Sequence, residues 1–305
     1  MDNGSVLRVP HPIPYQGSKR RLAVQILSLL PTGAHRLIEP FGGSAAVTLA
    51  AAARRSYERY LIADALAPLA GIWHLIMTDP GALIASYERL WRDQLGNPRD
   101  AYDQVRTSFN ETHEPAALLY LLARCVKASV RFNGEGKFNQ SPDNRRLGMR
   151  PSILRSHVMA AHALLNGHTE VRAADFRETL ADATSSDVVY MDPPYQGVSG
   201  ARDRRYAQAV SVHDLTSELE RLNRKQVPFV LSYDGTCGDR SYGEQLPADL
   251  GLRRVPAVWG RSAQSTLSGR AETTVESLYV SPRAQLDASE SGTVVRPDRQ
   301  ITLSV

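Results

Sequence analysis

Arg36-Leu37-Ile38-Glu39-Pro40-Phe41-Gly42-Gly43-Ser44 is the stretch of this chain that decides the fold. Its apolar first half predicts a short buried strand, its glycines a tight turn, and the alanine-rich residues 45–55 a helix for which Ser44 is placed as N-cap. A second strand, 59–63, follows and ends on Asp64, 21 residues beyond Gly43. The order of strand, glycine turn, helix, strand and acid predicts a doubly wound α/β sheet of the kind that binds an adenosine-containing cofactor.

The pattern changes to helices with few strand signals between residues 79 and 166. Within this block, Asn133-Gly134 between two short aromatic segments predicts a β-hairpin over residues 131–139. The alternation then resumes, with strands at 170–174, 187–191 and 228–232, a helix over 213–225, and two closing antiparallel strands at 252–259 and 273–280. We therefore expect a catalytic domain from residues 1–78 and 167–282, a mainly helical insert at 79–166, and a polar tail at 283–305.

Asp192-Pro193-Pro194-Tyr195 follows directly after the apolar run 187–191. A carboxylate and a proline carbonyl are two acceptors that can draw on the N–H bonds of an exocyclic amino group, whose lone pair is otherwise shared with its ring. The two prolines fix the backbone around these acceptors, and Tyr195 offers a flat surface on which an extruded base can stack. Such a tetrad is also typical of a strand that ends in a proline turn, so its function depends on the surrounding sequence.

The glycine turn lacks the G-x-G-x-x-G pattern with which nicotinamide-binding folds hold a pyrophosphate. S-adenosylmethionine carries no phosphate, and the two glycines leave room for its methionine and ribose. Asp64 lies at about the interval that reaches ribose hydroxyls. Lys19, in an N-terminal loop with Tyr15, is a candidate for pairing with the methionine carboxylate, and Asp175-Phe176 is a candidate for holding the adenine. The turn, the acid and the lysine together favour S-adenosylmethionine as cofactor.

Composition places the chain of 305 residues among globular proteins, with 42% hydrophobic residues and no apolar run near the roughly 20 residues of a membrane span. The first nine residues lack the apolar core of a signal peptide, so we expect a cytoplasmic protein. Two cysteines far apart and eight histidines without metal-ligand spacing predict neither a disulfide framework nor a metal site. A net charge of +4 and local arginine clusters favour a polyanionic partner.

The chain resembles the Dam-like, alpha-class (D12-type) DNA adenine-N6 methyltransferases over nearly its whole length. The shared order comprises Tyr15-Gln16-Gly17-Ser18-Lys19, Glu39-Pro40-Phe41-Gly42-Gly43, Asp64, a helical insert and the Asp192–Tyr195 tetrad. Arg131-Phe132-Asn133 with Gly136-Lys137-Phe138-Asn139 is similar to the R-x-N…G-x-F-N hairpin of the family, which enters DNA. Tyr206, Asp214 and Glu276-Ser277-Leu278-Tyr279 are similar to later landmarks. The combination of tetrad, insert and hairpin makes the resemblance specific.

The resemblance implies the Rossmann-like, seven-stranded mixed sheet of class I S-adenosylmethionine-dependent methyltransferases, with helices on both faces and a last antiparallel hairpin. It implies methyl transfer from S-adenosylmethionine to N6 of an adenine flipped out of duplex DNA. The implied catalytic residues are Asp192, Pro193, Pro194 and Tyr195. The implied cofactor-binding residues are Tyr15, Gly17, Lys19, Glu39, Pro40, Phe41, Gly42, Gly43, Ser44, Asp64, Asp175, Phe176 and Asp192. The implied DNA-binding residues are Arg131, Asn133, Lys137 and Asn139, and the basic segment that follows adds Arg145 and Arg146 as candidates.

One segment after the hairpin departs from the family. Relatives that read the short palindrome GATC usually carry P-F-G-K-R or similar there, whereas this chain has Ser141-Pro142-Asp143-Asn144-Arg145-Arg146. The element is longer and its glycine is missing. We therefore expect a recognition sequence other than GATC, with Arg145 and Arg146 as candidates for phosphate or base contacts.

The sequence leaves alternative functions open. The tetrad also suits RNA adenine-N6 or DNA cytosine-N4 methylation, and the fold suits an inactive DNA-binding subunit, although the acids at 64 and 192 favour an enzyme. Cytosine-C5 chemistry needs a Pro-Cys nucleophile, which Cys125 and Cys237 do not supply. A dehydrogenase is disfavoured by the missing phosphate-binding glycines. A cognate restriction endonuclease is a candidate partner, and the segment 196–211 is expected to close over the flipped base.

Overall fold

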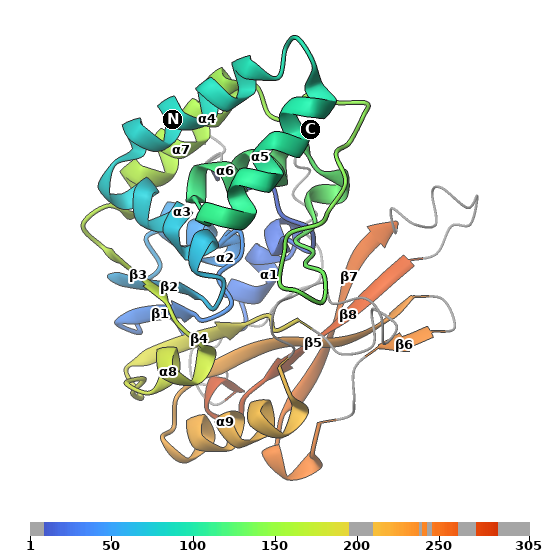
Figure 1. The fold of residues 1–305 in the computed structure, drawn as a ribbon. Helices are drawn as coiled ribbons and strands as arrows, with labels where there is room; N and C mark the ends of the chain where they lie inside the picture. Colours follow the sequence, from blue (N-terminus) through green and yellow to red (C-terminus); the bar gives the residue numbers. More distant parts are fainter. Residues whose placement is uncertain (1–8, 195–209, 238–239, 243–245, 262–272, 286–305) are drawn as a thin grey trace.

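In the part of the chain that the structure describes, seven strands form one mixed sheet (Figure 1). Their order across the sheet is β3 (Thr169–Ala173), β2 (Arg59–Asp64), β1 (Arg36–Glu39), β4 (Asp187–Met191), β5 (Phe229–Cys237), β8 (Thr273–Val280) and β7 (Arg253–Arg261). A short further strand, β6 (Arg240–Tyr242), pairs with β5. The computed structural model describes residues 9–194, 210–237, 240–242, 246–261 and 273–285. The predicted seven-stranded mixed sheet is confirmed.

The first five strands across the sheet are parallel, and the last two close it in antiparallel pairing. β1 lies between β2 and β4, with Ile38 in register with Leu61 on one side and Val189 on the other. Parallel strands bring their carboxyl ends to the same edge of a sheet, which is where ligands bind in open α/β folds. The segments that follow β1, β2 and β4 therefore meet, and these segments carry most of the predicted site residues.

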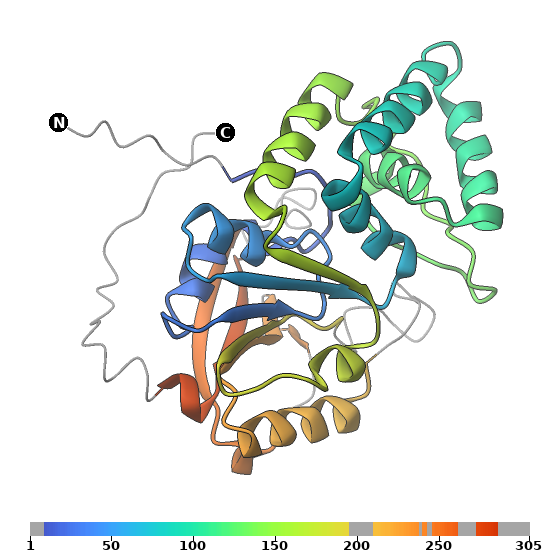
Figure 2. The same ribbon diagram turned by 90° about the vertical axis from the view of Figure 1, so that its left-hand side faces the viewer.

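Helices cover both faces of the sheet because its strands bury alternate residues on opposite sides (Figure 2). Leu37 and Tyr60 pack into one core, whereas their neighbours Ile38 and Leu61 pack into another. The first core is covered by α1 (Ala23–Leu27), α2 (Ala46–Ala53) and α3 (Ala67–Thr78), the second by α8 (Phe176–Leu180) and α9 (Val212–Arg224). Both layers hold the central strands rigidly, so the edge that carries the site has a fixed shape.

A further group of helices lies together at one end of the molecule (Figure 1). They are α4 (Pro80–Asp93), α5 (Pro98–Thr112), α6 (Pro115–Arg124) and α7 (Pro151–Leu165). Each begins with a proline, whose missing N–H is least needed in the first turn of a helix. Three of these helices pack on α3, so one apolar core continues from the sheet into this layer. The helical character of residues 79–166 is confirmed, and the domain boundaries stay a prediction.

The start of α2 differs from the prediction that Ser44 caps it. The helix begins at Ala46, and its N-cap is Ala45, which adopts the left-handed conformation with a φ of 45°. The Ser44 hydroxyl donates to the Ser18 hydroxyl at 2.7 Å, away from the helix. A distant acid caps the helix instead, because Glu39 Oε2 accepts from the Thr48 N–H at 3.0 Å. The sequence pattern failed here because the left-handed residue turns Ser44 toward the N-terminal loop.

β5 is longer than the predicted strand 228–232. It continues to Cys237 because β8 pairs with it along its far side. A bulge lies between Ser232 and Gly235, and Asp234 within it has a φ of 41°. The Tyr279 hydroxyl from β8 donates to the Asp234 carboxylate at 2.5 Å and fixes this bulge. Tertiary pairing therefore extends a strand that local sequence ends early. The predicted tail lies outside the described residues from 286 onward.

Candidate active site

The glycine turn after β1 lies against the end of β2. The Gly42 N–H donates to Ala63 O at 2.7 Å, and a Cβ on Gly42 would lie 2.8 Å from Ile62 Cγ2. Gly43 has a φ of 48°, and a Cβ there would lie 3.2 Å from the Tyr15 ring. Glycine is needed at both positions because backbone and ring approach so closely. The predicted turn is present, and Tyr15 covers it from the N-terminal loop.

Asp64, at the end of β2, is bound to the glycine turn. Its Oδ2 accepts from the Gly43 N–H at 3.0 Å, and its Oδ1 accepts from the Leu66 N–H at 2.9 Å. Burial raises the pKa of this carboxyl, while the two hydrogen bonds act against the shift. Each oxygen still has a lone pair that can accept from a hydroxyl. The geometry suits the predicted ribose contact, which stays a prediction.

Glu39, the last residue of β1, is a buried acid at the same edge. Its Oε2 accepts from both the N–H and the hydroxyl of Thr48, at 3.0 Å and 2.6 Å. Burial raises the pKa of Glu39 from the ordinary 4.5 to about 8, and the nearby charge of Asp192 adds to the effect. Glu39 therefore joins β1 to α2, and its protonation is tied to the charges around Asp192.

Asp192 follows β4 and is paired with a lysine from the N-terminal loop. The Lys19 Nζ lies 2.7 Å from Asp192 Oδ2, and the lysine side chain is 6% exposed against 21% for the aspartate. Lys19 also donates to Gly17 O at 3.2 Å. The lysine that the sequence assigned to a methionine carboxylate thus contacts the predicted catalytic tetrad. Two segments far apart in the chain meet at this ion pair.

Of the remaining tetrad residues, the structure describes the two prolines. Pro193 is buried and Pro194 is half-buried, so the backbone after Asp192 is held against the sheet. Tyr195 lies outside the described residues, as do Tyr206 and most of the segment predicted to close over the base. The stacking role of Tyr195 stays a prediction.

Two aromatic rings lie beside the glycine turn. Phe41 stacks on Phe176 with ring centroids 5.3 Å apart and an interplanar angle of 28°. Asp175 caps α8 by accepting from the Arg177 N–H at 3.0 Å, and it also binds the Arg177 side chain at 2.9 Å. The structure therefore brings Phe176 to the turn, whereas Asp175 is engaged with its own helix. An adenine contact for either residue stays a prediction.

Two residues of this site were not identified from the sequence. The Trp73 indole donates to Gly43 O at 2.9 Å from the buried face of α3, and Ser18 meets Ser44 as described above. Trp73 sits in an apolar helical stretch, where a tryptophan normally means only core packing. Its indole N–H supplies the donor that the carbonyl of the turn requires. No local signal could have distinguished this role from packing.

The hairpin of the helical insert is present in a compact form. Phe132 and Phe138 form an antiparallel bridge, and the Asn139 N–H donates to Arg131 O at 3.0 Å. Asn133 Oδ1 accepts from the N–H groups of residues 135 and 137, so this predicted DNA contact organises the turn. The left-handed glycine of the turn is Gly136, with a φ of 75°, and not Gly134 as the Asn-Gly pattern suggested. Arg131 and Asn139 are exposed at the base of the hairpin.

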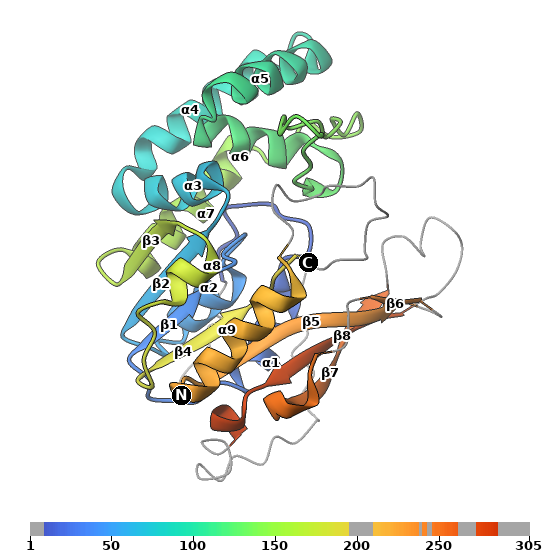
Figure 3. The same cartoon turned by 60° about the horizontal axis from the view of Figure 1, so that its bottom comes forward.

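The basic residues around the hairpin differ in their partners. Lys137 pairs with Glu135 at 3.2 Å, both exposed. Arg146 lies against Asp143, with Nη2 at 2.7 Å, whereas Arg145 contributes its main-chain N–H to the same carboxylate at 2.9 Å. DNA contacts by these residues stay predictions. The whole segment lies on the side of the molecule away from β3 (Figures 1 and 3).

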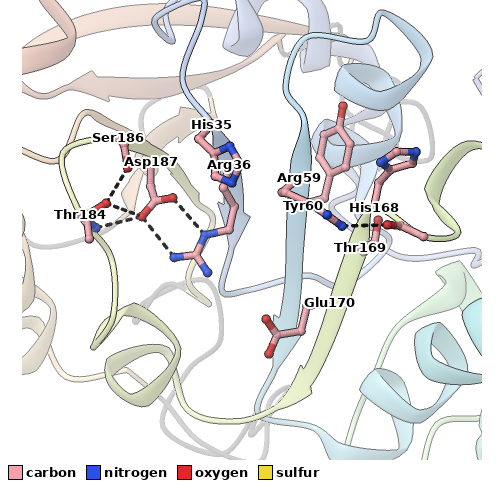
Figure 4. A pocket seen from close by; sticks show the side chains of 11 residues that line it. His35, Arg36, Arg59, Tyr60, His168, Thr169, Glu170, Thr184, Ser186 and Asp187 are labelled. Atoms are coloured by element: carbon pink, nitrogen blue, oxygen red, sulfur yellow. Dashed lines mark hydrogen bonds and ion pairs between the residues drawn. The ribbon is translucent and has the colours of Figure 1, made fainter.

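A pocket of about 550 Å³ lies at the opposite edge of the sheet, among the first residues of β1 to β4 (Figure 4). Arg36 donates to both oxygens of Asp187 at 3.0 Å and 3.1 Å, and Arg59 donates to Gly167 O at 2.8 Å. These charged side chains are engaged with one another or with the main chain. The length of the strands separates the pocket from Asp192, so it is not part of the predicted site.

Cys125, His157 and His162 have structural partners. Cys125 is buried, and burial raises the pKa of its thiol to about 12, which makes it a poor nucleophile. The His157 ring accepts from the His11 N–H at 3.2 Å, and the His162 ring bonds Ile76 O at 2.8 Å. Among the described residues there is no cluster of three or more side chains that could hold a metal ion. Of the helices in those residues, none has both the length and the apolar character of a membrane span.

Comparison with known proteins bears directly on this site. The family model of the D12 class N6 adenine-specific DNA methyltransferases matches residues 15–257. A DNA N-6-adenine-methyltransferase of Escherichia phage P1 is 30% identical over 81% of this chain, which spans only 32% of that relative. The retron Ec67 DNA adenine methylase of Escherichia coli is 30% identical over 75% of this chain and 79% of its own length. A type II methyltransferase of Lactococcus lactis, M1.LlaDCHI, is 24% identical over 87% of this chain and 94% of its own length. The chain therefore belongs to the D12 class of N6 adenine-specific DNA methyltransferases, and the predicted family and class of enzyme are confirmed.

Proposed function

We propose that this chain transfers a methyl group from S-adenosylmethionine to N6 of an adenine flipped out of duplex DNA, with Asp192 as the central catalytic residue. The observation that carries the proposal is the Lys19–Asp192 ion pair of 2.7 Å at the carboxyl end of β4. It adjoins the glycine turn, where Gly43 is hydrogen-bonded to Asp64 and to Trp73. Acid, turn and lysine thus lie at one edge, as transfer from a bound methyl donor requires.

The charges at this edge fit S-adenosylmethionine. The side chains that end β2 and follow β4 are the acids Asp64 and Asp192. Such a set would repel a pyrophosphate, whereas it attracts a ligand that carries a sulfonium, an ammonium and ribose hydroxyls. Bound there, S-adenosylmethionine would supply the electrophilic methyl group. Asp64 would accept from the ribose hydroxyls, and Phe41 and Phe176 would offer apolar surface to the adenosine.

Asp192 and Pro193 would make the adenine amine nucleophilic. The Asp192 carboxylate accepts one N6–H bond and the Pro193 carbonyl accepts the other, so the nitrogen lone pair localises on N6. In the transfer that bound S-adenosylmethionine would support, N6 would gain the methyl group and give up one proton, which the Asp192 carboxylate would accept and pass to water. Because both acceptors are fixed by the strand end and the prolines, little rearrangement is needed during the reaction.

Lys19 would act as a positioning residue for this carboxylate. Its ammonium lies 2.7 Å from Oδ2 of Asp192 and would fix the orientation of this carboxylate. The lysine is buried and tethered to Gly17 O, so the position of the carboxylate is defined before DNA binds. The methionine contact that the sequence suggested for Lys19 stays a prediction.

The insert would supply the DNA contacts. Arg131 stands at the base of the hairpin and is exposed, so its guanidinium can reach a guanine edge in the major groove. A helical layer with a projecting hairpin suits duplex DNA better than a single strand. The likeness to a type II methyltransferase supports a cognate restriction endonuclease as partner, and a DNA substrate supports a cytoplasmic location.

Replacing Asp192 with asparagine tests the proposal. We expect methyl incorporation into duplex DNA to fall by at least about a hundredfold, while S-adenosylmethionine binding measured by calorimetry changes little. Lys19→Gln should lower the turnover number more than it raises the Kd of the cofactor. The control is Asp249→Asn, an exposed acid far from the site along the chain.

The substrates compared are duplex DNA, single-stranded DNA and structured RNA, with the methylated nucleoside identified by mass spectrometry. N6-methyladenine from duplex DNA supports the proposal. Wild-type-like activity in Asp192→Asn, or N4-methylcytosine or methylated RNA as main product, would contradict it.

A further inference from the structure

The segment that follows the hairpin, residues 138–149, is held by side chains from three helices. It contains no regular helix or strand, yet its main-chain carbonyls are met by donors from α4, α5 and α6. The contacts are Asn110 Nδ2 to Phe138 O at 3.1 Å, Tyr102 OH to Gln140 O at 2.8 Å, Arg124 Nη1 to Asp143 O at 2.9 Å and to Arg146 O, Gln94 Nε2 to Leu147 O at 3.0 Å, and Tyr87 OH to Met149 O at 2.7 Å. We call residues 138–149 the recognition loop.

The donors to the recognition loop are themselves fixed. Tyr87, Gln94 and Tyr102 are fully buried, and Arg124 is 2% exposed. Asn110 also accepts from the Phe138 N–H at 2.7 Å, so it clamps both main-chain groups of that residue. A main chain held by buried partners loses little further freedom when a ligand binds. The recognition loop is therefore formed before DNA arrives, and the donors to its carbonyls come from helices outside it.

Two neighbouring arginines in the recognition loop have different environments. Arg146 directs Nε and Nη2 at Asp143 Oδ2, at 2.9 Å and 2.7 Å. The Arg145 main-chain N–H donates to Asp143 Oδ1, and this bond and the Arg146 side chain together lower the pKa of Asp143. The exposed Arg145 side chain makes no hydrogen bond or ion pair with any other residue in the described ranges. Arg146 thus supports the loop, whereas Arg145 is presented outward from a fixed main chain.

We propose that Arg145 determines part of the DNA sequence specificity by binding the edge of a guanine, and that Arg146 has a structural role. The inference rests on the proposed function, since it requires a DNA substrate. An arginine reads guanine through two hydrogen bonds to N7 and O6, which demands a defined origin for the side chain. Asp143 and Arg124 fix the position of the main chain on either side of Arg145. A contact with a phosphate oxygen does not require the main chain to be fixed in this way.

This assignment also explains the departure from the relatives that read GATC. The segment 141–146 differs from their pattern, and it is the part of the recognition loop that carries both arginines. Arg124 of α6 holds its carbonyls at Asp143 and Arg146, so the outward residues of the segment can change without loss of the loop. Asn110, Tyr102 and Arg124 are therefore positioning residues for Arg145.

Sequencing of methylated sites in a randomised duplex library tests the proposal. Arg145→Ala should relax the preference at one base position by roughly 10- to 100-fold and leave the other positions unchanged. Arg145→Lys should restore it only in part, because a flexible ammonium lacks the rigid, planar pair of donors that a guanidinium offers. Arg146→Ala is the matched control: it should reduce methylation of all sequences alike, with the same profile.

Two outcomes would overturn the proposal. A uniform loss over all sequences in Arg145→Ala, with the salt dependence of DNA binding reduced by about one ion, would mean a phosphate contact. Relaxed specificity in Arg146→Ala but not in Arg145→Ala would reverse the roles. If the wild-type chain methylates no DNA, the proposed function itself fails, whereas an active enzyme with an unchanged Arg145→Ala profile contradicts only this inference.

Hydrogen exchange on the full chain without DNA tests whether the loop is formed in advance. The Phe138 amide should exchange slowly, and Asn110→Ala should speed its exchange at least about tenfold. The control is Asn223→Ala, which removes a similar contact to Leu250 O at 3.0 Å in the catalytic part. Fast exchange throughout residues 138–149 in the wild-type chain would contradict a preformed loop.

Discussion

The carboxyl edge of the sheet and the recognition loop use hydrogen bonds in opposite directions. At the edge, main-chain N–H groups hold side-chain carboxylates: Gly43 and Leu66 bind Asp64, and Thr48 binds Glu39. In the loop, side-chain donors hold main-chain carbonyls, as Tyr102 and Arg124 do. The edge presents fixed acids on a rigid backbone, whereas the loop presents a fixed backbone whose outward side chains are exchangeable.

This difference predicts where substitutions act. Removing a carboxylate at the edge should remove a ligand contact and leave the fold intact. Removing a donor behind the loop should remove the shape of the loop, because carbonyls out of water would lose their partners. Changing an outward loop residue should alter recognition alone. Three predictions test this contrast, beginning with the largest effect.

Arg124→Met should destabilise the protein most. The variant keeps the apolar stem of Arg124 but loses the donors to Pro98 O, Asp143 O and Arg146 O. Hydrogen bonds to a charged donor are worth about 1.5–3 kcal/mol each and do not add fully, so we expect the free energy of unfolding to fall by about 3–5 kcal/mol. Urea unfolding followed by circular dichroism measures the change.

Arg99→Met is the matched control for Arg124→Met. Arg99 is 57% exposed and pairs with Asp103 within one helix, so its loss should lower the free energy of unfolding by less than about 0.5 kcal/mol. Equal losses in the two variants would mean that Arg124 does not support the loop. Retained cofactor binding in folded Arg124→Met would show that the edge is independent of the loop.

The edge of the sheet was largely predictable from sequence because its residues follow short buried strands. Residues 36–44, Asp64 and the strand before Asp192 are local patterns, and parallel pairing brings their ends together. The Lys19–Asp192 contact was not predictable, since it joins segments far apart in the chain. Ser44 was assigned as a cap from spacing alone, whereas the backbone of the turn gave that task to Glu39. Long-range geometry decided both cases.

The recognition loop was predictable only in its position. The predicted hairpin with its aromatic residues indicated where the loop lies, and the arginines indicated that it contacts DNA. The donors behind it carry no local signal: Asn110 is one polar residue on an amphipathic helix, and Arg124 ends an apolar run. Their roles depend on how three helices pack around the loop, which residue spacing does not encode.

Glu39→Gln should change how stability depends on pH. Burial raises the pKa of Glu39 to about 8, so between about pH 4.5 and 8 the folded protein keeps a proton that the unfolded chain releases. The free energy of unfolding of the wild type therefore falls as pH rises through this window. The free energy of unfolding should fall by about 1 kcal/mol per pH unit, which is about 2 kcal/mol between pH 6 and 8.

Glutamine keeps the acceptor for Thr48 and cannot ionise, so the variant should lack this slope. Urea unfolding at pH 6, 7 and 8 compares the two proteins. Glu58→Gln is the control, because Glu58 is 79% exposed and should leave the slope unchanged. Parallel curves for wild type and Glu39→Gln would mean that Glu39 is ionised throughout, and the acids at the edge would then carry more charge than we propose.

Asp64→Asn should have the smallest effect, and it tests the edge most directly. The amide has the shape of the carboxylate but only one acceptor, so it should accept ribose hydroxyls and the N–H groups of Gly43 and Leu66 less well. Burial already raises the pKa of Asp64, so replacing the charge relieves a desolvation cost that offsets the weaker hydrogen bond. The free energy of unfolding should therefore change by less than about 1 kcal/mol. The Kd for S-adenosylmethionine should rise about tenfold, which is about 1.4 kcal/mol.

Calorimetric titration with S-adenosylmethionine measures that Kd, and Asp79→Asn is the matched control. Asp79 accepts from the Ala82 N–H at 2.9 Å as the cap of α4, a task that asparagine performs equally well, so its Kd should equal that of the wild type. An unchanged Kd in Asp64→Asn would mean that the ribose does not bind at the end of β2. A large loss of stability in Asp64→Asn would show that the main role of this acid is to hold the turn and not to bind the ligand. The contrast between edge and loop would then fail, since both regions would depend on side chains for their shape.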